Sequence, residues 1–150
     1  MKFLYKIYKL LPIKIRWWIS YILADKFLVG FAALIFFDNK LLLVKQSYQY
    51  HYSLPCGFLK SQENLKEGIK REIKEELGLE IEVEEILDTI KDSRKSVFTI
   101  IVRCKVLRRD IKVDKKEVED AKFFGTDELP LDNILDVHMP IIEKFIIQLS

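Results

Sequence analysis

The segment "GFLKSQENLKEGIKREIKEELGL" (Gly57–Leu79) decides how the rest of this sequence is interpreted. Four aliphatic residues in it recur at every fourth position: Leu65, Ile69, Ile73 and Leu77. That spacing is typical of an amphipathic helix. Gly78 stands directly after the last of them, where a helix C-cap is expected. The segment therefore predicts a helix that begins near Asn64 and ends before Gly78.

Three glutamates crowd this helix: Glu72, Glu75 and Glu76. With about 100° of turn per residue they share one arc of about 100° that borders the apolar arc, and Glu76 overlaps the buried side. Like charges three and four residues apart repel each other, and partial burial raises their pKa values. A divalent cation would remove the conflict, and clustered carboxylates suit Mg²⁺. The alternative is a solvated helix face whose countercharges are Lys70, Arg71 and Lys74.

The spacing of the whole segment favours the metal site. Nine positions stand at fixed offsets, in the order Gly57, five residues, Glu63, seven residues, then Arg71-Glu72-Ile73-x-Glu75-Glu76-x-Gly78-Leu79. This resembles the Nudix box, G-x5-E-x7-R-E-U-x-E-E-x-G-U with U aliphatic, and every defined position matches. "LPCG" (Leu54–Gly57) is similar to the L-P-G-G of that family. "EVEDAKFFGTDELP" (Glu117–Pro130) is similar to its E-x-x-E-x-x-W-F-x-x-x-E-L-P segment, with Phe123 in the place of Trp.

The resemblance covers residues 28–149 and implies a fold and an activity. The implied fold is α/β, a Nudix-type α/β/α sandwich with a mixed sheet. The implied activity is that of a pyrophosphohydrolase, dependent on Mg²⁺ or Mn²⁺, which splits a nucleoside diphosphate linked to another moiety by attack of water on phosphorus. Such a substrate is polyanionic, so an acidic site needs metal ions between itself and the phosphates. Bound metal also lowers the pKa of water and neutralises charge on the leaving phosphate.

The resemblance assigns roles to the glutamates and the arginine of the box. Glu75 and Glu76 become metal ligands, and Glu72 becomes a further ligand or the general base. Glu63 binds metal through water or holds Arg71. Arg71 pairs with a glutamate and fixes its orientation, a task that suits the guanidinium fork.

Residues outside the helix complete the implied site. The backbone carbonyl of Cys56 takes a position at which the family supplies another metal ligand. Glu117 is the best match for a distant acid or base, with Glu119 and Asp120 as alternatives. Cys56 replaces the first glycine of the usual pair, Lys60 stands where an acid is common, and Gln62 stands where glycine is common. None of these departures falls on a defined box position.

A substrate-binding role is predicted for Tyr50 and Tyr52, in the run "YQYHY" (Tyr48–Tyr52), and more weakly for Lys60. Their rings could stack on a base, and the lysine could contact a phosphate. The alternative is a loop anchored by partly buried tyrosines, with a solvated lysine. No proline occurs in Asp92–Phe98, where the ADP-ribose subgroup of the family carries one, and the extended motif of NADH-specific members is absent. These absences disfavour both substrates.

Elsewhere the sequence predicts strands and one more helix. The predicted strands are 28–37, 41–44, 81–87, 96–107 and 121–124; the third strand alternates apolar and acidic residues, and the fourth is expected near the centre of the sheet. Asp38 and Asn39 mark a hairpin between the first two. Gly57 is expected to open a loop. A terminal helix is expected from about His138, with Pro140 in its first turn.

Composition fits one globular domain. The chain has 150 residues, 49% of them hydrophobic and 32% charged. Its two cysteines, Cys56 and Cys104, form no CxxC pair, which favours free thiols in the cytoplasm. The start of the chain lacks the features of a signal peptide. The longest apolar run, Leu28–Phe37, is half of the ~20 residues that span a bilayer.

Two segments are therefore expected, a basic aromatic helical arm at 1–26, interrupted by Pro12, and a hydrolase domain at 27–150. Residues 1–27 hold six cations and one acid, a net charge of +5 against +2 for the whole chain. The arm is expected to pack on the same fold or on a second subunit as a homodimer. An anionic membrane surface is the less favoured partner, and no stable nucleic-acid complex is expected.

The sequence thus leaves three functions to compare. The intact box favours the hydrolase. The same fold could instead sense a nucleotide without turning it over. The chain could also be a peripheral membrane or interaction protein that acts through its arm.

Overall fold

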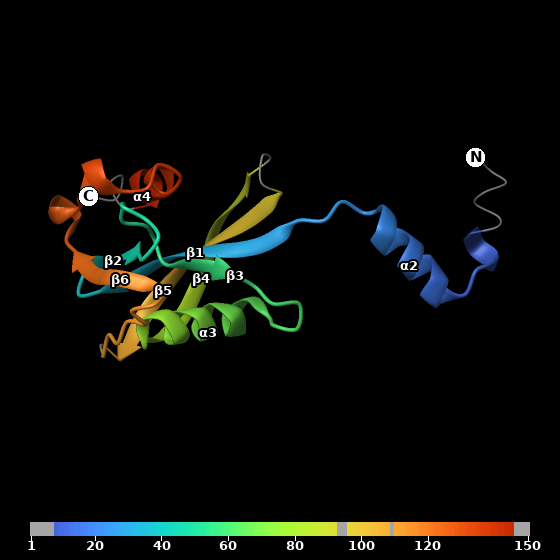
Figure 1. Ribbon diagram of the computed structural model, residues 1–150, viewed down its shortest axis with the longest axis horizontal. Helices are drawn as coiled ribbons and strands as arrows, with labels where there is room; N and C mark the ends of the chain where they lie inside the picture. Colours follow the sequence, from blue (N-terminus) through green and yellow to red (C-terminus); the bar gives the residue numbers. More distant parts are fainter. Residues whose placement is uncertain (1–7, 93–95, 109, 146–150) are drawn as a thin grey trace.

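The computed structural model describes residues 8–92, 96–108 and 110–145. A six-stranded sheet forms its centre, and helices lie on either side of it (Figure 1). The strands are β1 (Leu28–Phe37), β2 (Lys40–Gln46), β3 (Cys56–Phe58), β4 (Glu80–Asp92), β5 (Val97–Arg108) and β6 (Val118–Phe124). The helices are α2 (Ile13–Leu23), α3 (Leu65–Leu77) and α4 (Met139–Phe145), with short 3-10 turns at Thr126–Glu128 and Leu131–Asn133.

The sheet is mixed, as predicted. Its strand order is β4-β5-β1-β2-β6, and β3 pairs with β1 beside this path. The pairing of β1 with β5 is parallel, whereas the other strand pairs are antiparallel. Strand β5 lies between β4 and β1, which agrees with its continuous apolar sequence, since strands paired on both sides are usually buried.

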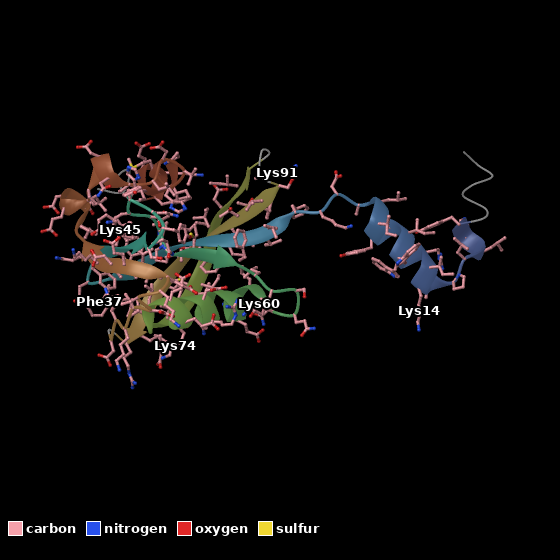
Figure 2. The ribbon with its side chains drawn as sticks, viewed as in Figure 1. Lys14, Phe37, Lys45, Lys60, Lys74 and Lys91 are labelled. Atoms are coloured by element: carbon pink, nitrogen blue, oxygen red, sulfur yellow. The ribbon has the colours of Figure 1, made fainter. Side chains whose placement is uncertain are left out.

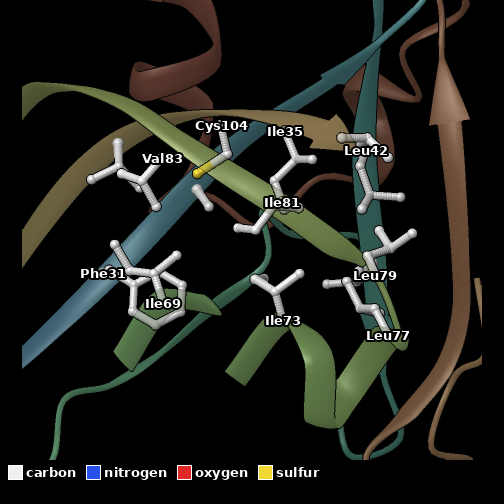
Figure 3. Close-up of a cluster of buried hydrophobic side chains, with 14 of the residues drawn as sticks. Phe31, Ile35, Leu42, Ile69, Ile73, Leu77, Leu79, Ile81, Val83 and Cys104 are labelled. Atoms are coloured by element: carbon white, nitrogen blue, oxygen red, sulfur yellow. The ribbon is translucent and has the colours of Figure 1, made fainter. Parts of the chain in front are cut away.

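Helix α3 covers one face of the sheet because its apolar stripe is buried there. Ile69, Ile73 and Leu77 are almost completely buried, and they meet side chains that point from β1 to the same face, Phe31 and Ile35 among them (Figure 3). The intervening β1 residues belong to a second core cluster on the opposite face. Alternation of this kind follows from the two-residue period of a strand.

Helix α4 belongs to the second cluster through Ile141 and Ile142. In Figure 1 it lies across the sheet from α3. The predicted α/β/α sandwich is therefore confirmed.

Most element boundaries match the sequence-based ones. β1 and α3 agree within a residue, and Asp38 and Asn39 have φ of 48° and 59°, the left-handed values of a tight hairpin turn. β4 runs five residues past Leu87. Shifts in its pairing with β5 interrupt the inside–outside alternation, and Ile86 is exposed as a result.

One expectation was wrong. Gly57 does not open a loop but is the central residue of β3, paired with Phe31 of β1. A three-residue strand is too short to show an alternating pattern, so nothing in its composition indicated it.

Helix α2 belongs to the predicted arm and stands apart from the sheet (Figures 1 and 2). Pro12 precedes its first residue, as the predicted interruption requires. None of its residues is buried, and Trp17 and Trp18 are 71% and 64% exposed. The described part of the arm therefore does not pack on its own fold. Residues 1–7 of the arm lie outside the described residues, as does the end of the predicted terminal helix. Among the described helices, none is long and apolar enough to cross a membrane.

The core beneath α3 predicts the effect of a truncation. Ile73→Ala leaves a cavity between the helix and the sheet, and the free energy of unfolding should fall by about 2–5 kcal/mol. Urea denaturation with an unchanged m-value is the measurement. Lys66→Ala, at an exposed position of the same helix, should change it by less than about 0.5 kcal/mol. Equal effects of the two changes would contradict this account of the core.

Candidate active site

A cavity of about 330 Å³ opens where α3, β3 and the first half of β1 meet. Six of its lining residues carry polar side chains: Gln46, Tyr48, Glu72, Glu76, Thr99 and His138. Gly30 and Cys56–Phe58 are also part of its wall. Two of the three glutamates singled out in the sequence therefore face one hollow.

Helix α3 is held in position at both ends. Asn64 caps its start by accepting a hydrogen bond from the Glu67 backbone N–H at 3.0 Å, and the Glu67 carboxylate accepts one from the Asn64 N–H at 3.3 Å. Gly78 ends the helix in a left-handed conformation, φ 67°, which glycine adopts without strain. These caps fix the residues at which the helix begins and ends, and the buried stripe of Ile69, Ile73 and Leu77 fixes its rotation and hence the direction of its glutamates.

Gly57 brings β3 against the helix. A Cβ atom at this position would lie 3.0 Å from Cγ of Glu72 and 3.2 Å from the ring of Phe31. A larger residue would press on the Glu72 side chain and the Phe31 ring, and these would have to shift. The glycine at the first box position is thus explained by close approach, which sets Glu72 beside the strand.

Arg71 binds three carboxylates. Its Nε and Nη2 form a fork with Glu63, the second contact being 3.0 Å. Its Nη1 lies 2.9 Å from Oε1 of Glu72 and 2.8 Å from Oε2 of Glu75. The Arg71 hydrogen bond lowers the pKa of Glu63 to about 2. Of the two roles considered for Glu63, the geometry matches the one that holds Arg71.

Glu76 is in a different environment. Only 8% of the residue is exposed, and the one hydrogen bond that its carboxylate accepts from a described residue is a long one, 3.4 Å, from Nε2 of Gln46. Burial raises the pKa of Glu76 to about 7, and the charges of Glu72, Glu117 and Glu75 act in the same direction. Glu76 therefore has no ion-pair partner in the described part of the chain, whereas Glu72 and Glu75 share Arg71.

Cys56 contributes backbone rather than thiol chemistry. Burial, with a smaller effect of Glu76, raises the pKa of the thiol to about 11, so it stays protonated at neutral pH. Along β3, Pro55 and Leu59 bond to β1 through their backbones. Backbone groups alternate in direction along a strand, so the carbonyl of Cys56 points away from β1. That direction leaves it available as a ligand.

The three candidates for a distant acid or base, Glu117, Glu119 and Asp120, have different surroundings in the structure. Glu117 directly precedes β6, where its carbonyl accepts a hydrogen bond from Ser47 N–H, and its charge acts on Glu76. Glu119 forms an ion pair with Lys45 at 3.1 Å. Asp120 accepts a 2.6 Å hydrogen bond from the Tyr52 hydroxyl. Among these three, Glu117 is the one whose charge acts on the buried glutamate.

The residues predicted to bind substrate do not line the cavity. Tyr50 is 87% exposed, and Tyr52 packs edge-on against the ring of Phe124. Lys60 is exposed on the loop between β3 and α3 (Figure 2). Their substrate-binding roles remain predictions to which the geometry adds no contact.

Sequence reasoning missed several wall residues: Gln46, Tyr48, Thr99 and His138. They come from three parts of the chain: the end of β2 and the turn after it, β5, and the segment before α4. Tyr48 lies in the tyrosine-rich run, so composition pointed to its neighbourhood. Thr99 reaches the cavity because β5 pairs in parallel with β1, opposite Gly30, a register that no local pattern reveals.

The donor set suits a hard divalent cation by its chemistry, because carboxylate and carbonyl oxygens predominate. Among the described residues, no three acidic, histidine or cysteine side chains are already gathered as metal ligands. Arg71 accounts for this, since it holds Glu72 and Glu75. The buried and poorly neutralised carboxylate of Glu76 is the observation that indicates a cation.

Comparisons with known proteins agree with this geometry. The family model described as NUDIX domain matches residues 26–145. A NUDIX hydrolase from Nitrosomonas europaea is 25% identical, with a TM-score of 0.75 over 81% of this chain and 71% of that one. A UDP-X diphosphatase is 26% identical, with a TM-score of 0.68 over 86% and 66% of the two chains.

A third solved structure is similar as well. An ADP-ribose pyrophosphatase from Streptococcus suis is 26% identical, with a TM-score of 0.62 over 70% of this chain and 78% of that one. A search among curated proteins finds no significant match.

Burial of Glu76 predicts that replacing it with glutamine stabilises the metal-free protein at high pH. In the folded chain the pKa of Glu76 is about 7, against 4.5 ordinarily, so between these pH values the folded state binds more protons than the unfolded state. Stability without metal therefore falls as the pH rises from about 4.5 to 7. Glu76→Gln should remove this loss, so its Tm in EDTA should exceed that of the wild type at pH 8 and approach it near pH 4.5.

Thermal unfolding at several pH values measures the difference. Glu84→Gln, at an exposed position of β4, is the matched control and should show no growing difference. A Glu76→Gln variant that is less stable than the wild type at pH 8 would contradict the burial argument.

Proposed function

The chain belongs to the Nudix family of hydrolases, enzymes that act on acid anhydrides, and from this premise we propose its reaction. It splits a phosphoanhydride bond in a nucleoside diphosphate linked to another moiety, by attack of water on phosphorus. One observation carries the proposal: Glu72 and Glu76 of an intact box line one cavity with Cys56 and Gly57. The relatives described as UDP-X diphosphatase and ADP-ribose pyrophosphatase support a nucleotide substrate.

Mg²⁺ is the proposed cofactor, with Mn²⁺ as a substitute. Glu76, Glu72, Glu75 and the carbonyl of Cys56 would hold it, which requires Glu72 and Glu75 to turn from Arg71. Bound metal would lower the pKa of the attacking water and screen the phosphates from the glutamates.

The protein's own side chains would position the metal ligands and deprotonate the attacking water. Arg71, anchored by its fork with Glu63, holds Glu72 and Glu75 through one guanidinium nitrogen in the metal-free chain, and so keeps both carboxylates next to the site that the metal would occupy. Glu72 or Glu117 takes the proton of the attacking water, and both lie near enough to Glu76 for their charges to act on it. Phe31, Phe58 and Val97 form the apolar part of the cavity wall.

A substrate panel tests the proposal. Phosphate release should be measured on nucleoside triphosphates, nucleotide sugars, ADP-ribose and dinucleoside polyphosphates, with Mg²⁺ and with EDTA; for diphosphate-linked substrates the products need phosphatase treatment first. At least one substrate should be turned over only with metal. Glu76→Gln should lower kcat by about 100-fold or more, since it removes a charged ligand.

Glu84→Gln serves again as the control and should retain wild-type turnover. Tight nucleotide binding without turnover of any substrate would instead favour a sensing module. Turnover unaffected by EDTA would contradict the metal-dependent mechanism.

We also propose that residues 1–26 form a separate arm that docks on a second subunit, and that the enzyme works in the cytoplasm. The exposed apolar side chains of α2 support the docking, because an area of this kind is usually covered. Free Cys56 and Cys104 fit a reducing compartment.

Deletion of residues 1–26 tests the arm. The full chain should sediment as a dimer and the shortened chain as a monomer, while kcat/KM should stay within about three-fold because the described part of the arm, residues 8–26, contributes no residue to the cavity. Flotation with phosphatidylserine vesicles is the comparison. A monomeric full chain that floats with the vesicles would favour the membrane instead.

A further inference from the structure

We infer that His138 donates a hydrogen bond from Nε2–H to a phosphate oxygen of the substrate, and so belongs to the binding site. The inference rests on the proposed hydrolysis of a diphosphate. His138 lies outside the Nudix box, which spans Gly57–Leu79. His138 lines the same cavity as Glu72 and Glu76, and only 8% of it is exposed.

The orientation of the His138 ring is fixed from two sides. Its backbone carbonyl accepts hydrogen bonds from Ile141 and Ile142 in the first turn of α4, and its backbone N–H donates to Leu135. Its Nδ1 accepts the backbone N–H of Leu54 at 3.2 Å. The side chain is therefore positioned by both the helix and the segment that leads into β3.

This hydrogen bond also fixes the tautomer. A backbone N–H can only donate, so Nδ1 carries a lone pair and the proton of the neutral ring is on Nε2. Burial lowers the pKa of His138 to about 4, which keeps the ring neutral at physiological pH. Nε2–H forms no hydrogen bond with any described residue, so the ring presents a donor without a partner.

The cavity needs such a donor. None of its lining residues is Lys or Arg, and Arg71 is occupied by Glu63, Glu72 and Glu75. Gln46 already donates to Glu76. Phosphate oxygens that bind no metal therefore depend on neutral donors, and His138, the residue directly before α4, is such a donor. A neutral donor also avoids attraction to the glutamates, which a histidinium would suffer.

Two substitutions separate binding from folding. His138→Asn places Oδ1 near the position of Nδ1, so it can accept the Leu54 N–H, but it has no donor at the position of Nε2. His138→Gln places its NH₂ near the position of Nε2 and loses the acceptor for Leu54. The inference predicts opposite results for binding and stability in this pair.

The binding probes are α,β-methylene ADP and α,β-methylene UDP, whose bridges resist hydrolysis, titrated calorimetrically with Mg²⁺. His138→Asn should keep the wild-type Tm within about 2 °C and weaken binding about 10- to 100-fold, the range for a hydrogen bond to a charged group. His138→Gln should lower the Tm by about 3–8 °C and keep Kd within about three-fold. With a substrate from the panel, the loss in His138→Asn should appear in KM, with kcat nearly unchanged.

Wild-type affinity in His138→Asn overturns the inference, as does a His138→Gln variant that folds and binds as weakly as His138→Asn. If His138→Gln fails to fold, the result for His138→Asn decides alone. Binding of a probe without turnover of any substrate contradicts the proposed hydrolysis, while the two variants still test His138. A wild type that neither binds a probe nor turns over a substrate overturns both.

Discussion

The close approach of α3 to β3 is the constraint on which the site depends. Gly57 leaves room for the Glu72 side chain to lie against the strand, and the buried stripe of Ile69, Ile73 and Leu77 prevents the helix from rotating away. Because the glutamates border that stripe, the same packing that stabilises the domain turns Glu76 inward. The core and the site are thus built on two adjoining faces of one helix.

Arg71 complements this arrangement because it neutralises three of the neighbouring carboxylates and leaves the fourth, Glu76, without an ion pair in the described part of the chain. Three carboxylates share its guanidinium, while Glu76 is left with a single long hydrogen bond from an amide. An acidic cluster that was fully neutralised by arginine would have little affinity for a cation. One that was not neutralised at all would repel itself and disturb the helix. The observed division keeps the helix folded while one carboxylate still lacks a countercharge.

Much of this could be predicted from sequence because it follows from local spacing. The recurrence of aliphatic residues at every fourth position from Leu65 predicted the helix. The angular position of Glu76 on that helix predicted its burial. β3 could not be predicted, since a three-residue strand has no period of its own. The opposite wall of the cavity could not be predicted either: Thr99 depends on a parallel register, and His138 depends on a contact with Leu54, 84 residues earlier. Contacts of that range follow from topology, not from local patterns.

The buried glutamate and the buried histidine show how the same burial has two chemical results. Desolvation disfavours the charged form of both groups, so it raises the pKa of Glu76 and lowers that of His138. For the glutamate the outcome is a carboxylate that a bound cation would stabilise, because the metal would replace the water that burial removed. For the histidine it is a donor that stays neutral beside acidic neighbours. A cavity that is acidic on the α3 side and neutral on the α4 side would therefore hold the proposed metal-bound diphosphate asymmetrically, with charge compensated on one side and hydrogen bonding supplied on the other.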